Sequence, residues 1–228
     1  MWIIGDGGSP QRAPDNTRAS FEMAIAEWAD GLLVHARQTL DHFMVLSRPE
    51  KIRTPEGEHS LETLDQETLK GLNPLHALLG LTDFLDWVGT RPIRAFVEPA
   101  GTLLSERESL ERLAQMLLEA RTGIPVSLVL PSGVQSPAGF SEDRIWRTIP
   151  QGTSLPLEKD RPKVQAIVTG ELAISGQCNG LKKILVITSG LVPPIQKLRQ
   201  LPGFWGVVTP TPYFTRKAAA SRPPGGAS

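Results

Sequence analysis

Three side chains that can bind a cation or transfer a proton lie at the ends of short apolar runs in this sequence. Asp6 directly follows one run, His35 closes a second and Glu98 closes a third. Carboxylates and neutral imidazoles are ligands for divalent cations, so His35 and Glu98 could form a metal site beside Asp6. The alternative is a hydrogen-bonded pair of His35 and Glu98 that holds no cation.

A second group of residues could bind an anion. Arg48, Lys51 and Arg53 lie close together in the chain, and the forked donors of a guanidinium suit a phosphate group. A solvated basic loop would have the same residues. The sequence therefore leaves two interpretations of this segment open.

Glycines and the single cysteine are weaker candidates. Gly5, Gly7 and Gly8 could present backbone amides to a phosphate, although a tight turn after a strand would also require glycine. Cys178 has no recognisable histidine partner nearby in the sequence, and the four histidines are not spaced as a zinc motif.

The composition is that of an ordinary globular protein without a strong electrostatic field. The chain has 228 residues, 40% of them hydrophobic, and a formal net charge of zero, so no global field recruits nucleic acid or an anionic membrane. One cysteine excludes an internal disulfide and fits a reducing compartment. Neither a signal peptide nor a run of about 18 apolar residues is present, which predicts a cytoplasmic protein without a membrane span.

Apolar runs predict eight strands separated mainly by helices and loops. They fall at residues 2–5, 32–35, 43–46, 93–98, 126–130, 164–168, 184–187 and 204–208. The first strand–helix–strand unit favours parallel pairing. Eight parallel strands in a chain of this length predict a compact α/β fold, a (β/α)8 TIM barrel. We expect one domain over residues 1–215 and a disordered tail over 216–228, which has little to bury.

Helices are indicated by apolar spacing and by capping residues. Asn16 or Thr17 can cap a helix whose apolar stripe begins at Phe21. Ser105 and Glu108 fit a capping box for a helix that ends near residue 120. Weaker helical patterns occur at residues 142–147, near 172 and at 195–201.

Several segments, in order, resemble the glycerophosphodiester phosphodiesterase family. Residues 13–17 (Ala-Pro-Asp-Asn-Thr) resemble the family's Ala-Pro-Glu-Asn-Thr, and residues 96–99 (Phe-Val-Glu-Pro) resemble its Val-Glu-x-Lys strand. Residues 206–212 resemble a last strand that normally ends in Thr-Asp-x-Pro. The resemblance implies a TIM barrel of this type.

The resemblance also implies a catalytic site, most of which is replaced in this chain. The family uses two histidines as acid and base and three carboxylates that hold a divalent cation. The first histidine belongs after Gly5 and the second at Ser47, with an acid at the neighbouring position, Arg48. The family's Glu-x-Asp pair matches Leu33 and His35.

The remaining catalytic positions follow the same trend. Glu98 is the one metal carboxylate that survives, and the final acid is replaced by Pro210. Losing groups that act as a unit removes most of a site's catalytic power. The chain is therefore interpreted as a pseudoenzyme that has lost phosphodiester hydrolysis and needs no cofactor.

Three hypotheses follow for the function. The first is a barrel that binds a phosphorylated or glycerol-containing small molecule, or a partner protein. The second is an active, divergent phosphodiesterase of lipid or glycerol metabolism that uses Ca²⁺ or Mg²⁺. The third is a structural or regulatory interaction protein. Ligand binding is assigned to four residues and metal binding to two: Asp6, Asn16, Arg48 and Arg53 for the ligand, and Glu98 and His35 for the metal.

Overall fold

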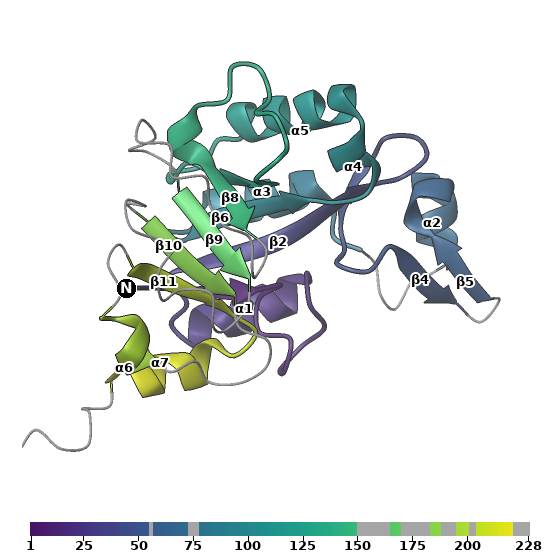
Figure 1. Ribbon diagram of the computed structural model, residues 1–228. Helices are drawn as coiled ribbons and strands as arrows, with labels where there is room; N and C mark the ends of the chain where they lie inside the picture. Colours follow the sequence, from purple (N-terminus) through teal and green to yellow (C-terminus); the bar gives the residue numbers. More distant parts are fainter. Residues whose placement is uncertain are drawn as a thin grey trace, which may run out of the picture.

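The computed structural model describes residues 1–54, 57–72, 78–149, 165–169, 183–187, 195–200 and 204–220. Strands and helices alternate over most of this length (Figure 1). In chain order the elements are β1 (Trp2–Asp6), α1 (Arg18–Ala26), β2 (Gly31–Gln38), β3 (Met44–Leu46), β4 (Lys51–Thr54), β5 (Gly57–Ser60), η1 (Leu61–Thr63), α2 (Gln66–Leu72), α3 (Leu81–Gly89), β6 (Arg94–Pro99), α4 (Thr102–Ser105), α5 (Arg107–Glu119), β7 (Ser127–Pro131), η2 (Glu142–Arg144), β8 (Ile145–Ile149), β9 (Gln165–Thr169), β10 (Lys183–Ile187), α6 (Ile195–Leu198), β11 (Phe204–Thr209) and α7 (Pro212–Ala220).

A curled parallel sheet forms the centre of the fold. Its strands follow the order β2, β6, β7, β8, β9, β10 and β11, and each neighbouring pair is parallel. Strand β1 pairs in parallel with β11 on one side and with β2 on the other. The predicted class, an α/β fold of TIM-barrel type, is confirmed at this level.

Two predicted elements differ from the structure. One expected parallel strand is antiparallel and one unexpected parallel strand is present, so the number of parallel strands among the described residues stays at the predicted eight. Residues 43–46 were expected in a parallel strand, but β3 pairs antiparallel with β2. Only residues 39–43 separate the two strands, and a parallel connection needs about a dozen residues or more. Residues 142–147 were expected to be helical. The 3₁₀ helix η2 covers Glu142–Arg144, but β8 begins at Ile145 and pairs in parallel with β7. Ile145 and Trp146 are both buried, in different apolar clusters, which a strand achieves by alternation.

Of the two predicted helix caps, the one at Thr17 is confirmed and the one at Ser105 is wrong. Thr17 caps α1, where its side chain accepts a hydrogen bond from the backbone amide of Ser20. The capping box at Ser105 was wrong, because Ser105 closes the short helix α4 and Glu106 occupies the cap position of α5. The Glu106 carboxylate accepts a hydrogen bond from the hydroxyl group of Ser109 at 2.9 Å instead.

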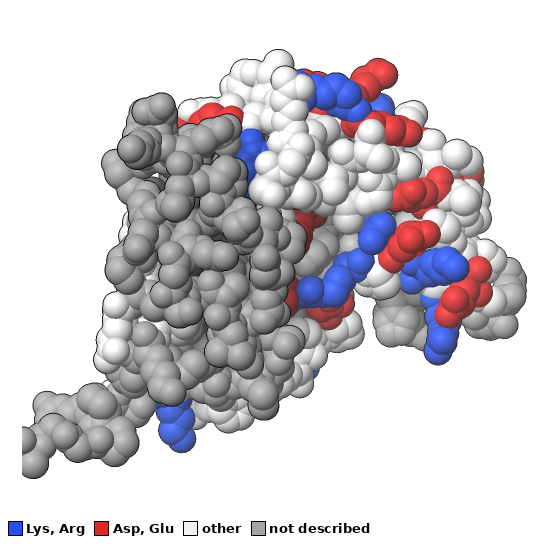
Figure 2. Space-filling view, in the orientation of Figure 1, with Lys and Arg blue, Asp and Glu red and all other residues white. Residues whose placement is uncertain are grey.

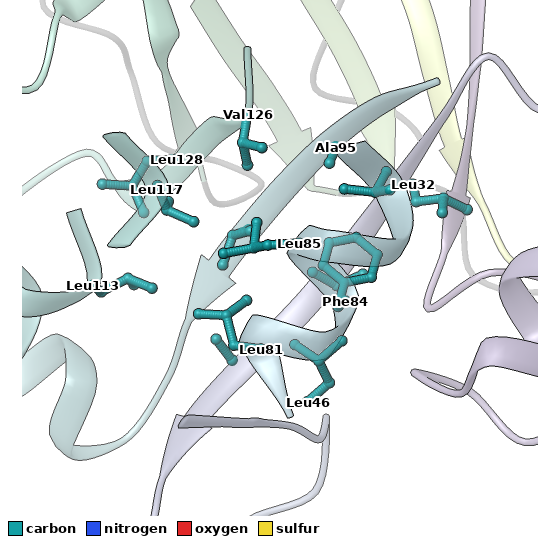
Figure 3. Packing of buried hydrophobic residues seen from close by; sticks show 14 of the residues in the cluster. Leu32, Leu46, Leu81, Phe84, Leu85, Ala95, Leu113, Leu117, Val126 and Leu128 are labelled. Atoms are coloured by element: carbon teal, nitrogen blue, oxygen red, sulfur yellow. The ribbon is translucent and has the colours of Figure 1, made fainter. Parts of the chain in front are cut away.

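The apolar core has two layers, one on each side of the sheet. The outer layer packs α3 and α5 against β2, β6 and β7, and Figure 3 shows leucine side chains around Phe84 there. The inner layer lies on the concave side and draws on six strands. Its members are Ile4, Leu33, Phe96, Val129, Trp146 and Val208. This inner layer fills the space between the amino ends and the carboxyl ends of the strands.

The end of the chain is more ordered than expected up to Ala220. Residues 216–220, assigned to the disordered tail, continue helix α7. Within this helix, the Arg216 guanidinium donates to the Trp28 carbonyl at 2.5 Å and to the Asp30 carboxylate at 2.7 Å. Residues 221–228, and Cys178 with them, lie outside the described residues. Among the helices described, none is long and apolar enough to cross a membrane.

Candidate site at the carboxyl ends of the strands

Strands β1, β2 and β6 bring the three predicted acid–base residues together. His35 and Glu98 are register partners on neighbouring parallel strands, and Asp6 is the last residue of β1. The imidazole Nε2 of His35 lies 3.4 Å from Glu98 Oε2 and 3.6 Å from Asp6 Oδ1. The prediction that these side chains gather is therefore confirmed.

Asn16 fixes the orientation and the tautomer of His35. Its Oδ1 accepts a hydrogen bond from the His35 backbone amide at 3.0 Å, so its Nδ2 is the group that lies 3.3 Å from His35 Nδ1. An amide nitrogen only donates, so Nδ1 is the acceptor and the ring proton of neutral His35 resides on Nε2. That N–H is directed toward the two carboxylates.

Arg48 is the cation of the site. Its Nη2 lies 2.7 Å from Asp6 Oδ1, and its Nε lies 3.0 Å from Asp15 Oδ2. The Arg48 side chain is 44% exposed, whereas that of Asp6 is only 10% exposed. We call the whole group the strand-end cluster. It consists of Asp6, Asp15, Asn16, His35, Arg48 and Glu98.

Burial moves the pKa values of His35 and Glu98 in opposite directions. Desolvation lowers the pKa of His35 from 6.5 to about 4, against the opposing attraction of Asp6. Desolvation, helped by the negative charge of Asp6, raises the pKa of Glu98 from 4.5 to about 7. At neutral pH the imidazole is therefore uncharged, and Glu98 is divided between its charged and neutral forms.

The glycine loop after β1 is a tight turn. Gly7 and Gly8 have φ of 68° and 95°, a backbone region that favours glycine. The Gly7 amide donates to the Leu33 carbonyl and the Ser9 amide to the Ser20 carbonyl, so both point into the protein. Of the two interpretations of these glycines, the turn agrees with the structure.

Two positions, one matched to a family metal ligand and one to its second catalytic histidine, carry structural roles here. Leu33 is 1% exposed and belongs to the inner apolar layer. Ser47 donates from its backbone amide to the His35 carbonyl and from its hydroxyl to the Pro49 carbonyl. Neither side chain is directed at a cation.

Arg53 does not join the strand-end cluster. It lies on the β4–β5 hairpin, where its 86% exposed side chain pairs with Glu58 at 3.1 Å. The hairpin and α2 project from the side of the sheet (Figure 1). Basic and acidic side chains are interspersed over the visible surface there, so no patch of one sign forms (Figure 2).

Sequence reasoning missed Asp15 and the pair of Arg37 with Glu62. Arg37 Nη1 lies 3.7 Å from Glu62 Oε1, and its Nε and Nη2 donate to the Arg48 carbonyl. Asp15 stands beside Asn16 in a motif interpreted as part of the fold, and that adjacency was the available signal. The partner of Arg37 had no local signal, because Glu62 lies on η1, beyond the three intervening strands β3, β4 and β5.

The arrangement is better suited to internal charge pairing than to a hard cation. Among the described residues, no group of three or more His, Cys, Asp or Glu side chains is arranged to hold a metal ion. The Arg48 guanidinium already supplies positive charge at Asp6, and Leu33 offers no oxygen where the family has a carboxylate. The residues present therefore fit the family's divalent cation poorly.

Comparison with known proteins relates the fold to one family. No family model matches the sequence. No curated protein matches it either. Solved structures do match, including a phosphodiesterase from Oleispira antarctica in complex with the product sn-glycerol-3-phosphate, at 17% identity, with 97% of each chain covered and a TM-score of 0.73.

Two further structures have the same outline. A glycerophosphodiester phosphodiesterase from Parabacteroides distasonis is 15% identical, with 96% of each chain covered and a TM-score of 0.72. One from Thermotoga maritima is 17% identical, covers 95% of this chain and 97% of its own, and has a TM-score of 0.70. The chain therefore has the fold of the glycerophosphodiester phosphodiesterases, as the sequence resemblance implied.

Proposed function

We propose that this chain, built on the fold of the glycerophosphodiester phosphodiesterases, no longer carries out standard phosphodiester hydrolysis and binds a phosphorylated or glycerol-containing small molecule at the strand-end cluster. The observation that carries the proposal is the ion pair between Arg48 and Asp6 at 2.7 Å. The ion pair places the guanidinium of a side chain against a carboxylate that a metal-dependent site would need for its cation.

Acid–base chemistry has weak support in the same cluster. A general acid or base is most useful when its pKa lies near the working pH. The pKa of His35 is about 4, and its Nδ1 is occupied by Asn16, so the imidazole is a poor proton acceptor at neutral pH. Ser47, at the position of the family's second histidine, bonds to backbone groups.

The ligand class follows from the donors that Arg48 retains. A guanidinium has five N–H donors, and the bonds to Asp6 and Asp15 use one on Nη2 and the one on Nε. The Arg48 side chain is 44% exposed, so the other donors can be reached by a phosphate oxygen. Asp6, Asp15 and Glu98 oppose a highly charged ligand, so we expect weak binding of a phosphate-bearing ligand with hydroxyl groups.

Two measurements on the purified chain test the proposal. Hydrolysis of glycerophosphocholine and glycerophosphoethanolamine is followed with Ca²⁺ or Mg²⁺ present, and binding of sn-glycerol-3-phosphate is measured by calorimetry. We expect no turnover above background and a binding signal that Arg48→Gln removes. Robust turnover that Glu98→Ala abolishes would overturn the loss of hydrolysis.

One observation favours the alternative, an active and divergent metal-dependent phosphodiesterase. The pKa of Glu98 is about 7, which suits a group that gives or takes a proton near neutral pH. This version requires a stoichiometric Ca²⁺ or Mg²⁺ bound with Asp6, His35 and Glu98. Titration of the wild-type chain with each cation separates the two proposals, because the first expects no binding heat.

We also propose that the sheet closes as a barrel and consider a partner protein as the ligand. The two parallel partners of β1 support a sheet that closes as a (β/α)8 barrel. A partner protein in place of a small molecule would be supported by a pull-down partner together with no shift of the melting temperature by sn-glycerol-3-phosphate. A cytoplasmic location and a role in lipid metabolism stay predictions from the sequence and the resemblance.

A further inference from the structure

A separate cavity lies where β1 and β11 begin, at the other end of the strands from the strand-end cluster. It has a volume of about 580 Å³ and is lined by Met1, Trp2, Arg199, Phe204 and Trp205. Small-molecule sites in proteins have volumes of about 300–1,000 Å³. We call this cavity the tryptophan pocket.

The aromatic wall of the pocket depends on an irregularity in β11. Phe204 pairs with Ile184 and Gly206 with Leu185, so Trp205 is an extra residue in the strand. Consecutive strand residues normally point to opposite faces, and a bulge re-aims one of them. The bulge therefore allows Phe204 and Trp205 to line the same cavity.

Trp205 and Trp2 meet edge to face, with ring centroids 3.9 Å apart and an interplanar angle of 63°. Behind them lies Trp146, whose ring centroid is 6.3 Å from that of Trp2 and 6.4 Å from that of Trp205. Trp146 is buried in the inner apolar layer. The pocket wall is thus supported by packed aromatic rings and offers a preformed stacking surface.

Two arginine side chains lie close to the pocket. Arg199 is exposed on the rim, and the Arg94 guanidinium lies 4.0 Å from the centre of the Trp2 ring. Asp30, beside the start of β1, is already engaged, because its Oδ2 accepts from the Ile3 amide at 2.8 Å and from Arg216 at 2.7 Å. The carboxylates of the strand-end cluster lie at the far end of the strands.

We propose that the tryptophan pocket binds a small planar aromatic carboxylate. The ring of the ligand packs against Trp2 and Trp205, and its carboxylate pairs with Arg199. An aromatic ring matches the aromatic wall, and a negative charge matches the exposed Arg199 guanidinium on the rim. This site is independent of the function proposed for the strand-end cluster.

Calorimetry with four probes tests the ring and the charge separately, on the full chain with its amino terminus untagged. Indole-3-acetate carries both features, indole-3-acetamide lacks the charge, tryptamine reverses it, and acetate lacks the ring. We expect indole-3-acetate to bind about fivefold more tightly than the amide, since an exposed ion pair contributes about that factor. Tryptamine and acetate should give no measurable binding.

Variants locate the binding in the pocket. Trp205→Leu should weaken indole-3-acetate about tenfold, the scale of one aromatic contact. Arg199→Gln, a surface change that leaves the core intact, should reduce the preference for the acid over the amide to about one. Arg18→Gln replaces an exposed arginine on α1 and should change neither value. Arg48→Gln, in the strand-end cluster, should also leave indole-3-acetate binding unchanged.

Three results overturn the proposal: no binding of indole-3-acetate, equal binding of acid and amide, or a preference for the acid that survives Arg199→Gln. If Trp205→Leu fails to fold, the Arg199→Gln variant and the comparison of the four probes still test whether the pocket binds the ligand. Loss of indole-3-acetate binding in Arg48→Gln would place the ligand at the strand-end cluster instead.

Discussion

The imidazole of His35 and the carboxyl group of Glu98 lie 3.4 Å apart, and folding reverses their order of proton affinity. In the unfolded chain the pKa of His35 is 6.5 and that of Glu98 is 4.5, so the histidine holds a proton more tightly. In the fold these values become about 4 and about 7. Between pH 4.5 and 6.5, folding therefore deprotonates His35 and protonates Glu98.

The first prediction concerns stability against pH. The lowered pKa of His35 makes its contribution complete above pH 6.5 and lost as the pH falls toward 4. The raised pKa of Glu98 makes its contribution complete below pH 4.5 and lost as the pH rises toward 7. Between pH 4.5 and 6.5 the two slopes have opposite signs, and in the wild type they cancel.

Substitution of either residue should expose the other slope. Relative to wild type, the free energy of unfolding of Glu98→Gln should rise with pH by roughly 1 kcal/mol per unit between pH 4.5 and 6.5. That of His35→Gln should fall by a similar amount. Urea unfolding at three pH values measures both, and parallel curves for the three proteins would contradict the reversal.

The second prediction concerns Arg48 as the cation of the site. In Arg48→Gln, Asp6 and Asp15 lose their shared partner, and the chain should be destabilised by about 1 kcal/mol because the pair is partly exposed. The same variant should gain stabilisation by Ca²⁺ that the wild type lacks. Thermal unfolding with and without about 10 mM CaCl₂, about 100-fold above a Kd of roughly 0.1 mM, would detect a shift of about 2.7 kcal/mol.

Arg53→Gln is the matched control for that experiment. Arg53 also pairs with a carboxylate, that of Glu58, but lies on the β4–β5 hairpin. Its loss should change stability by less than about 0.5 kcal/mol and should create no calcium effect. An equal calcium effect in both variants would show that the internal cation has no special role.

The third prediction concerns Asn16, which combines a left-handed backbone with two bonds to His35. Its φ is 56°, a region that costs an ordinary side chain about 1 kcal/mol or more. Asn16→Ala should lose about 3 kcal/mol of stability, from the strain and from the buried His35 amide left without an acceptor. Asn16→Gly should lose about 1 kcal/mol less, because glycine accepts this backbone. Equal losses in chemical unfolding would mean that strain contributes nothing.

The fourth prediction concerns the turn that positions Asp6. A Cβ on Gly8 would meet Ser20 Oγ at 2.5 Å and the Ser20 carbonyl carbon at 2.6 Å, and φ there is 95°. Gly8→Ala should therefore cost more than about 2 kcal/mol. Gly57→Ala also has positive φ but no atom within 4 Å of the new Cβ, so only strain of about 1 kcal/mol remains. Melting temperatures that do not separate the two variants would argue against the close packing of the turn.

Much of the fold could be predicted because its signals are local. The start of the apolar stripe of α1, at Phe21 and Ala24, and the buried runs of β1, β2 and β6 are properties of neighbouring residues, and the structure places them as expected. The errors arose where a local pattern was ambiguous. A short apolar run at 43–46 is the same for a parallel strand and a hairpin strand, and the charged residues at 142–144 hide the start of β8.

By itself, the sequence determined which side chains stand at the ends of the strands and which expected catalytic groups are replaced there. Only the tertiary structure decided how the remaining groups pair. Arg48 reaches Asp6 across 42 positions of the chain, and the buried surroundings of His35 and Glu98 come from several strands. Desolvation and ion pairing depend on distance and burial in three dimensions, and a linear sequence encodes these only through the completed fold.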